Sequence, residues 1–574
     1  MSGNPPPLRT PVGPDAHRWR TFPGRKTVVA AARTVTSTVR VLETLPDLLR
    51  GDDRLTVVFA YDPTSAFGDG VLDLLHDAGC RVMPWSQLAD IEPDLIVSAS
   101  ENIDVPAGDC PVLVLPHGVG FQKLVPDSRS ARSRLSGMVP DALLEAGRAW
   151  LAVSHPEQEE QLAAAHPKTA GRTLLVGDPC FDQLLRGLPR RSEHRRALGV
   201  TGGRRLAVLS STWGPTSLLG RDPDLVRGLL AALPYDEYRL AAITHPNVRS
   251  AHGDWETHRI LAPAVDAGLL LMSPVHDWRP ALTAADVVIG DHGSVTLYGA
   301  ALGKPVLLAA FGSDAVPETA AAGLGRAAPR LDPHGDLYEQ VEEAVRTHAP
   351  DRYADIARRA FADPGQAVAR LRTAVYELLK LPEPRSAPPL TALPAPAASP
   401  AADVTSWRVV TSAATAAESG QWSVTVRRRP AAAVEDPTAD EETAEGVYAH
   451  LASDVGAERD QRLAESASVL VNRAPARSAV AALRWIDETL AGFTGGFLAL
   501  AALDGGGALA GLRDGRRVEA TATGSDTDPG LCAAVIYTCL RAGIPLDGTV
   551  VTLRVGAVRE EDVALRLRPI AQLP

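Results

Sequence analysis

Aromatic residues are scarce in this chain, where Phe, Trp and Tyr make up 5% of the 574 residues. Its cores must therefore be built mainly from Ala, Val and Leu. Cysteine is scarce too, with five scattered residues. An odd number of cysteines within apolar runs favours buried thiols in a reducing compartment over a disulfide framework.

Long apolar runs are also missing. No uncharged run reaches about 18 residues, so the sequence predicts no transmembrane helix. Residues 1–26 carry prolines and arginines without the apolar middle of a signal peptide, and we expect a disordered basic tail there. These features predict a cytoplasmic protein, either free or peripheral at the inner face of the membrane.

Acidic residues outnumber basic ones, 69 to 58, which gives a formal net charge of −11. This excess argues against broad nucleic-acid binding, and we expect no nucleic-acid partner. Any membrane contact should be local.

Apolar runs alternate with helical patterns from residue 27 to residue 382. The expected strands are 27–31, 55–61, 94–99, 111–115, 150–153, 173–176, 205–210, 238–244, 269–272 and 287–289. Such alternation predicts an α/β fold with parallel sheets covered by helices. The pattern restarts after a polar stretch at 186–204, so we expect two Rossmann-like lobes, residues 27–190 and 191–382.

A Pro- and Ala-rich stretch without periodicity, residues 383–403, predicts an extended linker. Residues 404–574 follow it and mix strand-like runs with two helical patterns, at 477–490 and 531–542. They predict a separate α+β domain, to which the sequence assigns no function.

The segment from Asp286 to Leu308 contains the most informative motif. An apolar run ends in a small polar turn, Gly290 to Ser294, and a helical stretch follows. The N–H groups and the dipole at the start of a helix favour an anion, so this turn suits a diphosphate. A glycine turn that binds nothing remains the alternative.

Two histidines stand where expected strands end. His117 follows the strand 111–115 in the sequence Pro-His-Gly, and His245 follows the strand 238–244 and precedes Pro246. Open α/β sheets bind ligands at the carboxyl ends of their strands. His117 is a candidate general base, or else a residue that caps its loop. His245 is a candidate ligand of a phosphate oxygen or a sugar hydroxyl.

Hydroxyl groups and arginines supply further candidates. Ser211 and Thr212 end the strand 205–210 and form either a phosphate-facing turn or a helix cap. Arg129, Arg132 and Arg134 follow the first histidine and either attract an anionic acceptor or form a solvated loop. No Asp-x-Asp metal motif stands out in the two lobes, and we expect neither a metal nor a cofactor.

The order of these motifs resembles the CDP-glycerol glycerophosphotransferases of teichoic-acid synthesis, which have the GT-B glycosyltransferase architecture. The matching pieces, in the family's order, are the His-Gly turn and lysine at 116–123, the Gly-x-Pro-x-x-Asp stretch at 177–182, the strand end at 211–213, His245-Pro246, and the turn at 290–294 with Lys304-Pro305. The resemblance covers about residues 27 to 380. The turn at 290–294 also resembles that of UDP-N-acetylglucosamine 2-epimerases.

The resemblance implies roles for these residues. His117 would be the base that activates the acceptor, and His245 a second essential histidine near the diphosphate. The implied donor-binding residues are Ser211, Thr212, Asp291, His292, Gly293, Ser294, Val295 and Thr296. The implied acceptor-binding residues are Gly118, Lys123, Arg129, Arg132 and Arg134.

The resulting hypothesis is a transferase of cell-envelope polymer synthesis. It would move a glycerophosphate or glycosyl group from a nucleotide diphosphate donor, such as CDP-glycerol or a nucleotide sugar, to a hydroxyl group. The acceptor would be a polymer or a lipid-linked molecule. Two alternatives stay open: a GT-B nucleotide-sugar epimerase or glycosyltransferase, and a non-catalytic GT-B protein that binds a nucleotide or a partner.

Overall fold

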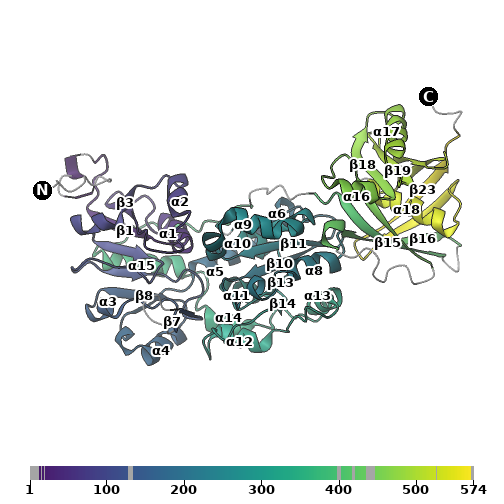
Figure 1. Cartoon of the computed structure of the whole chain (residues 1–574). Coiled ribbons are helices and arrows are strands. Elements are labelled where there is room, and N and C mark those ends of the chain that lie inside the picture. Colours follow the sequence, from purple (N-terminus) through teal and green to yellow (C-terminus); the bar gives the residue numbers. More distant parts are fainter. Residues whose placement is uncertain are drawn as a thin grey trace.

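The computed structural model describes residues 12–13, 16–18, 20–126, 133–273, 275–396, 403–415, 420–434, 446–524 and 527–569. Two α/β lobes and a third, β-rich body follow one another along the molecule (Figure 1).

The N-terminal lobe is built on a seven-stranded sheet of order β3-β2-β1-β4-β5-β8-β9, in which every pairing is parallel. Its strands are β1 (Lys26–Ala32), β2 (Leu55–Tyr61), β3 (Val82–Pro84), β4 (Leu95–Ser98), β5 (Val112–Val114), β8 (Ala149–Val153) and β9 (Thr173–Leu175). The helices of this part are α1 (Val35–Leu48), α2 (Val71–Asp77), α3 (Asp141–Glu145), α4 (Pro156–Ala165) and α5 (Pro179–Gly187). Separate apolar clusters cover the two faces, as a parallel sheet requires.

The C-terminal lobe repeats this plan with a five-stranded parallel sheet of order β12-β11-β10-β13-β14. Its strands are β10 (Arg205–Ser211), β11 (Tyr238–Thr244), β12 (Leu270–Leu271), β13 (Val287–Gly290) and β14 (Val306–Leu308). Its helices are α6 (Arg191–Ala197), α7 (Leu218–Arg221), α8 (Leu225–Ala232), α9 (Pro246–Asp266), α10 (Trp278–Ala284), α11 (Ser294–Ala301), α12 (Ala320–Ala327), α13 (Leu337–Arg346) and α14 (Ala354–Ala360). The expected α/β class with two Rossmann-like lobes is confirmed.

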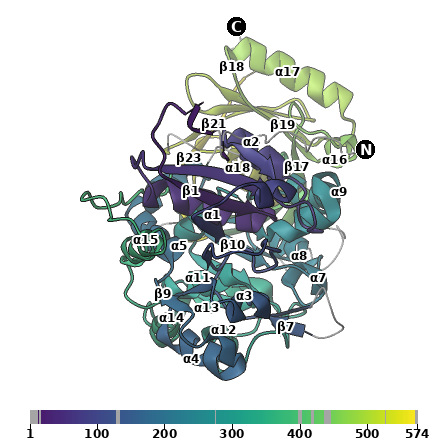
Figure 2. The ribbon, with the colours of Figure 1, turned by 90° about the vertical axis from the view of Figure 1, so that its left-hand side faces the viewer.

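The last helix of the two-lobed part crosses back to the first lobe. α15 (Ala367–Leu378) lies beside the N-terminal sheet in both ribbon views (Figures 1 and 2). Leu371 and Val375 of α15 share an apolar cluster with Val41 and Leu45 of α1. The expectation that residues 191–382 form one lobe is wrong for this helix, because chain order alone does not show where an amphipathic helix packs.

The described part of the expected linker packs on the lobes instead of extending freely. Leu393 is 1% exposed and belongs to an apolar cluster of the C-terminal lobe. The guanidinium of Arg190 donates to its carbonyl oxygen, and Thr391 donates to Asp47. Single apolar residues in a Pro- and Ala-rich stretch carry no periodic signal, so the sequence could not reveal this packing.

The third body is a closed barrel of order β15-β16-β22-β23-β21-β20-β19-β18-β17. Its strands are β15 (Ser406–Thr415), β16 (Trp422–Pro430), β17 (Val447–Asp454), β18 (Val469–Ala476), β19 (Leu498–Leu503), β20 (Ala508–Leu512), β21 (Arg517–Ala522), β22 (Thr549–Val555) and β23 (Arg559–Leu567). The helices of this body are α16 (Gln461–Ser466), α17 (Ala479–Gly492) and α18 (Pro529–Ala542). Each residue of α18 from Gly530 to Cys539 is buried among inward-facing strand residues.

The barrel is fixed to the C-terminal lobe through a buried arginine. Arg428 of β16 is 2% exposed and forms two hydrogen bonds with Asp236, which follows α8. A third bond joins it to Asp528 at the start of α18. The guanidinium also lies over the rings of Tyr235 and Trp407. One residue thus links the lobe to both the wall and the central helix of the barrel.

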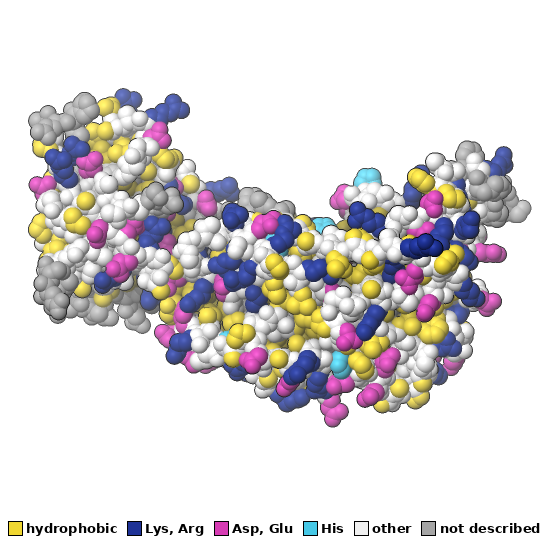
Figure 3. Space-filling view, turned by 180° about the vertical axis from the view of Figure 1, so that it is seen from behind, with side chains coloured by type: hydrophobic (Ala, Val, Ile, Leu, Met, Phe, Trp, Pro, Cys, Tyr) yellow, Lys and Arg dark blue, Asp and Glu magenta, His cyan; other side chains and the backbone are white. Residues whose placement is uncertain are grey.

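Among the described residues, no helix combines the length and apolarity needed to cross a lipid bilayer. On the face seen in Figure 3, cationic and anionic side chains are interspersed.

Candidate active site

A cavity of about 490 Å³ lies between the two lobes. It is lined by the segments that follow β1, β4 and β5 of the first lobe and β10, β11 and β13 of the second. In both sheets the strands are parallel, so their carboxyl ends meet at one edge. The two edges face each other across this cavity.

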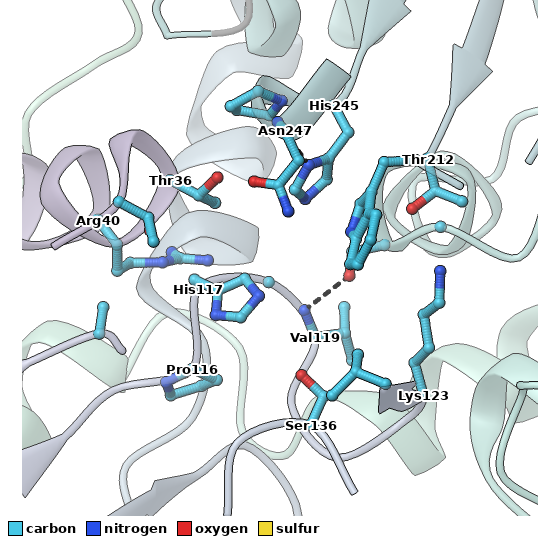
Figure 4. Close-up of a pocket in the computed structure, with 18 of the residues that line it drawn as sticks. Thr36, Arg40, Pro116, His117, Val119, Lys123, Ser136, Thr212, His245 and Asn247 are labelled. Carbon is cyan, nitrogen blue, oxygen red and sulfur yellow. Dashed lines mark hydrogen bonds between the residues drawn. The ribbon is translucent and has the colours of Figure 1, made fainter. Parts of the chain in front are cut away.

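His117 and His245 line the cavity from opposite lobes, and Figure 4 shows both imidazoles within it. His117 stands on the loop after β5, and His245 follows β11 directly. The sequence predicts a strand end for each histidine, but local patterns do not show that the two share one space. The structure brings them together.

The loop that carries His117 is held by the opposite lobe. The backbone N–H of Val119 donates to Ser294 Oγ, the first side chain of α11, over 3.1 Å. A Cβ atom on Gly118 would lie 2.6 Å from that same oxygen. Gly118 is therefore needed for a close approach of the two lobes, and the Ser294 hydroxyl positions the histidine loop.

His245 is held as a neutral imidazole with a defined proton position. Its Nδ1 accepts the backbone N–H of Asn247 over 3.1 Å, and His245 also caps α9. Burial, together with His117 and Lys123, lowers the pKa of His245 to about 3. Because Nδ1 accepts, the proton of the neutral ring lies on Nε2. His245 thus presents a hydrogen-bond donor rather than a base.

Glu101 is a candidate residue that the sequence analysis missed. Residues Ser98 and Val114 are paired in β4 and β5, and Glu101 and His117 each follow three residues later. Glu101 lines the same cavity, is 6% exposed, and forms a 2.9 Å ion pair with Arg134. Burial alone would raise the pKa of its carboxyl, but His117 and Arg134 bring it below its usual value. A carboxylate beside His117 stabilises a protonated imidazole.

Lys123 bridges the two lobes at the side of the cavity. Its ammonium group lies 3.2 Å from Asp314 and 5.5 Å from the ring centre of Trp213. His292 Nε2 lies 3.0 Å from the same carboxylate, while His292 Nδ1 accepts the N–H of Gly312. Burial alone would raise the pKa of Asp314, but His292 and Lys123 hold it well below the usual range. The Asp314 loop was also missed, since nothing local in the sequence connects it to Lys123.

Asp291 and Thr296 do not line the cavity, contrary to their predicted role in donor binding. The Asp291 carboxylate is buried and accepts the backbone N–H groups of Thr212, Leu218 and Gly293. Thr296 is fully buried and faces the sheet, where a Cβ on Gly290 would lie 2.2 Å from its hydroxyl oxygen. Both residues support the turn through contacts inside the C-terminal lobe.

The other predicted donor-side residues lie at the cavity wall. His292, Gly293 and Val295 line it with Ser294, and so do Ser211 and Thr212. The Ser211 hydroxyl is used within the lobe, since it donates to the carbonyl of Thr212 and accepts the N–H of Leu219. Gly293 caps α11 without a side-chain hydrogen bond, so the first N–H groups of α11 remain available for an anion.

The predicted acceptor side is only partly described. Gly118, Lys123 and Arg134 line the cavity. Arg129 and Arg132 lie outside the described residues. Elsewhere, the motif residue Lys304 is buried at a distance from the cavity lining and donates to the carbonyls of Thr283 and Ala285.

The stretch 177–182 shapes the connection between the lobes. Asp178 caps α5 and accepts the hydroxyl of Tyr298 over 2.7 Å. Asp182 accepts the N–H groups of Gly365 and Ala367, at the start of α15. Gly177 has φ +85°, and a Cβ there would lie 3.2 Å from Ala367. These contacts hold together the two points where the chain passes between lobes.

Among the comparisons with known proteins, only the one with solved structures finds matches. No protein-family model matches the chain, and no curated protein matches it. The wall teichoic acid polymerase TagF matches with 13% identity and a TM-score of 0.42, over 62% of this chain and 89% of that one. The complex of S. aureus MnaA with UDP matches with 12% identity and a TM-score of 0.40, over 63% and 99%. The UDP-GlcNAc 2-epimerase from Neisseria meningitidis, bound to UDP-GlcNAc, matches with 14% identity and a TM-score of 0.40, over 62% and 100%.

Proposed function

We propose that this protein is a transferase that moves a glycerophosphate or glycosyl group from a nucleotide diphosphate donor to a hydroxyl acceptor. One observation carries the proposal: His117 of one lobe and His245, with the start of α11, of the other line a single cavity. The motif resemblance to CDP-glycerol glycerophosphotransferases supports the donor class and a role in cell-envelope polymer synthesis.

In this mechanism the donor diphosphate lies against the C-terminal lobe. The free N–H groups at the start of α11 and the Nε2–H of His245 donate to its oxygens. The lowered pKa of His245 keeps its ring neutral, so it polarises the leaving phosphate through a hydrogen bond from Nε2–H. Preorganised donors of this kind contribute about 3 kcal/mol each to transition-state stabilisation.

The acceptor hydroxyl enters beside His117. Its oxygen forms a bond to the transferred phosphorus or carbon while its proton passes to the imidazole. The bond between the transferred group and the nucleotide phosphate breaks, and the leaving phosphate keeps the electron pair. The Glu101 carboxylate stabilises the imidazolium that results. A placed base of this kind contributes roughly 10²–10⁴ in rate.

The test uses the purified full chain with CDP-glycerol or UDP-N-acetylglucosamine, followed by ³¹P NMR with and without hydroxyl acceptors. We expect wild type to consume one donor and to release the matching nucleotide. His117→Asn should bind the same nucleotide but lose at least about 100-fold in turnover. Arg346→Gln, on the exposed surface of α13, is the matched control.

Two results would contradict the proposal. His117→Asn could turn over at the wild-type rate, or wild type could bind nucleotides and never consume a donor. The second outcome would leave a non-catalytic nucleotide-binding protein. Conversion of UDP-N-acetylglucosamine to an isomer, with no group transferred to the acceptor, would instead identify an epimerase.

A further inference from the structure

Arg40 of α1 places a positive charge in the wall of the cavity, on the lobe that carries His117. The residue is 7% exposed, yet its side chain lines the cavity, and Figure 4 shows its guanidinium extending toward His117. No motif in the sequence explains a cation at this position of an amphipathic helix. Its role must come from what surrounds it.

The contacts of the Arg40 guanidinium with Tyr298 and Asp178 are long. Its guanidinium donates one long hydrogen bond, 3.5 Å, to the hydroxyl of Tyr298, and it lies 3.9 Å from Asp178. The Asp178 carboxylate already accepts three shorter bonds, from the N–H groups of Cys180 and Phe181 and from the Tyr298 hydroxyl. Arg40 is thus near a carboxylate whose oxygens are occupied by other donors.

The next carboxylate on the same helix is also occupied. Glu43 is the ion-pair partner of Arg279, which is itself 4% exposed. Burial and the nearby charge of Arg40 lower the pKa of Arg279 to about 10. The two guanidinium groups therefore repel each other, and this wall of the cavity retains cationic character.

A second polar group stands one helical turn before Arg40. Thr36 lines the cavity, and its hydroxyl oxygen is buried without a hydrogen-bond partner among the described residues. Residues four apart lie on the same face of a helix, so this hydroxyl and the guanidinium face the same region. The buried unsatisfied hydroxyl costs free energy, and the guanidinium has five N–H donors of which Tyr298 receives one over a long distance. An anion that accepts from both groups would remove the cost at Thr36 and pair with the cation.

We propose that Arg40 and Thr36 form a phosphate-binding subsite on the wall of the N-terminal lobe, apart from the start of α11. The planar fork of a guanidinium matches two phosphate oxygens, which makes phosphate the fitting anion. Because His117 stands on the same lobe, this phosphate belongs to the acceptor. Only that assignment rests on the proposed function; the binding of phosphate to Arg40 does not.

The test is isothermal titration calorimetry of the full chain with sn-glycerol 3-phosphate and, separately, with CDP. We expect Arg40→Gln to weaken binding of sn-glycerol 3-phosphate by at least about 10-fold while leaving CDP affinity within about 2-fold of wild type. Arg346→Gln should bind both probes as wild type does. If Arg40→Gln weakens CDP and sn-glycerol 3-phosphate equally, the phosphate at Arg40 comes from the donor and the acceptor assignment is wrong.

Thermal unfolding separates this role from a structural one. The Arg40–Asp178 contact is long and Asp178 keeps three other donors, so Arg40→Gln should unfold close to the wild-type temperature. Tyr298→Phe removes the hydrogen bond between Arg40 and the Tyr298 hydroxyl and should still bind sn-glycerol 3-phosphate. The proposal is overturned if Arg40→Gln unfolds well below wild type while Tyr298→Phe loses the probe as well. It is also overturned if wild type binds CDP but not sn-glycerol 3-phosphate, a result that leaves the transferase proposal intact.

Discussion

The hydroxyl of Ser294 accepts a hydrogen bond from the backbone N–H of Val119, 3.1 Å away, and thereby joins the two lobes at the base of the cavity. Val119 stands two residues after His117, and Ser294 begins the helix whose N–H groups face the cavity. The candidate base and the candidate phosphate cradle are therefore held in one fixed relation. Their geometry depends on how closely the lobes approach.

Gly118→Ala should disturb this relation directly. The new methyl group would lie 2.6 Å from Ser294 Oγ and 3.1 Å from Ser294 Cβ, so the His117 loop must shift. A displacement of about 1 Å at a reacting group costs roughly 100-fold in rate, and we expect kcat to fall by about that factor. Steady-state kinetics and thermal unfolding measure the two effects. Gly492→Ala, where a Cβ meets nothing within 4 Å, is the control. Wild-type kcat in Gly118→Ala would show that the loop position is unimportant.

Glu101→Gln should change the pH dependence of turnover. The charges of His117 and Arg134 lower the pKa of the Glu101 carboxyl, so Glu101 stays ionised and can stabilise the positive charge that His117 gains with the acceptor proton. With the neutral amide of Glu101→Gln we expect kcat to fall by about 10-fold, and the acid-side fall in kcat that protonation of Glu101 causes should disappear. Steady-state kinetics over a series of pH values measures both effects. Wild-type kcat and an unchanged pH profile in Glu101→Gln would exclude this electrostatic link.

Binding of a phosphate ligand should cause His245 to become protonated in mildly acidic solution. Its pKa of about 3 keeps the ring neutral. The negative charge of a bound phosphate would favour the protonated ring and raise that pKa past its ordinary value. At pH 5–6 the CDP complex should therefore take up protons, whereas at pH 8 it should not. Calorimetry in buffers of different ionisation enthalpy measures this uptake. His245→Gln should bind CDP without it, and equal uptake in the two proteins would place the titrating group elsewhere.

The barrel should be sensitive to acid through His450 of β17. This imidazole is buried against Tyr537, neither ring nitrogen has a hydrogen-bond partner among the described residues, and burial lowers its pKa to about 3. The unfolded chain binds the proton near pH 6.5, so native stability is complete above that pH and falls as pH drops toward 3. Each pH unit in this window costs about 1.4 kcal/mol.

His450→Phe should therefore flatten the pH dependence of unfolding between pH 6 and pH 4, as measured by denaturant titration at a series of pH values. His258→Gln, at an exposed position on α9, is the matched control and should keep the wild-type slope. An unchanged slope in His450→Phe would mean that the ring already gains its proton in the folded barrel.

Local patterns predicted much of the two lobes. β2 and β11 have the expected bounds, since short apolar runs between turns mark buried parallel strands well. α9 was missed because Pro246 and Pro263 lie within it, Gly253 interrupts its helical backbone, and its apolar residues follow no clear stripe. The closure of the barrel was missed as well, because strand pairing between distant segments leaves no local signal.

The sequence by itself determined which residues stand at strand ends, and so it placed His117, His245 and the turn at 290–294 at the edges of two parallel sheets. This follows from local chemistry: apolar runs make buried strands, and polar residues end them. Only the tertiary structure decided which of these side chains share a cavity. It turned Asp291 and Thr296 away from the cavity, and it brought Glu101 and Arg40 to the wall. It also paired Asp314 with the wall residue Lys123. The direction of a side chain and its partner on another lobe depend on packing between segments far apart in the chain.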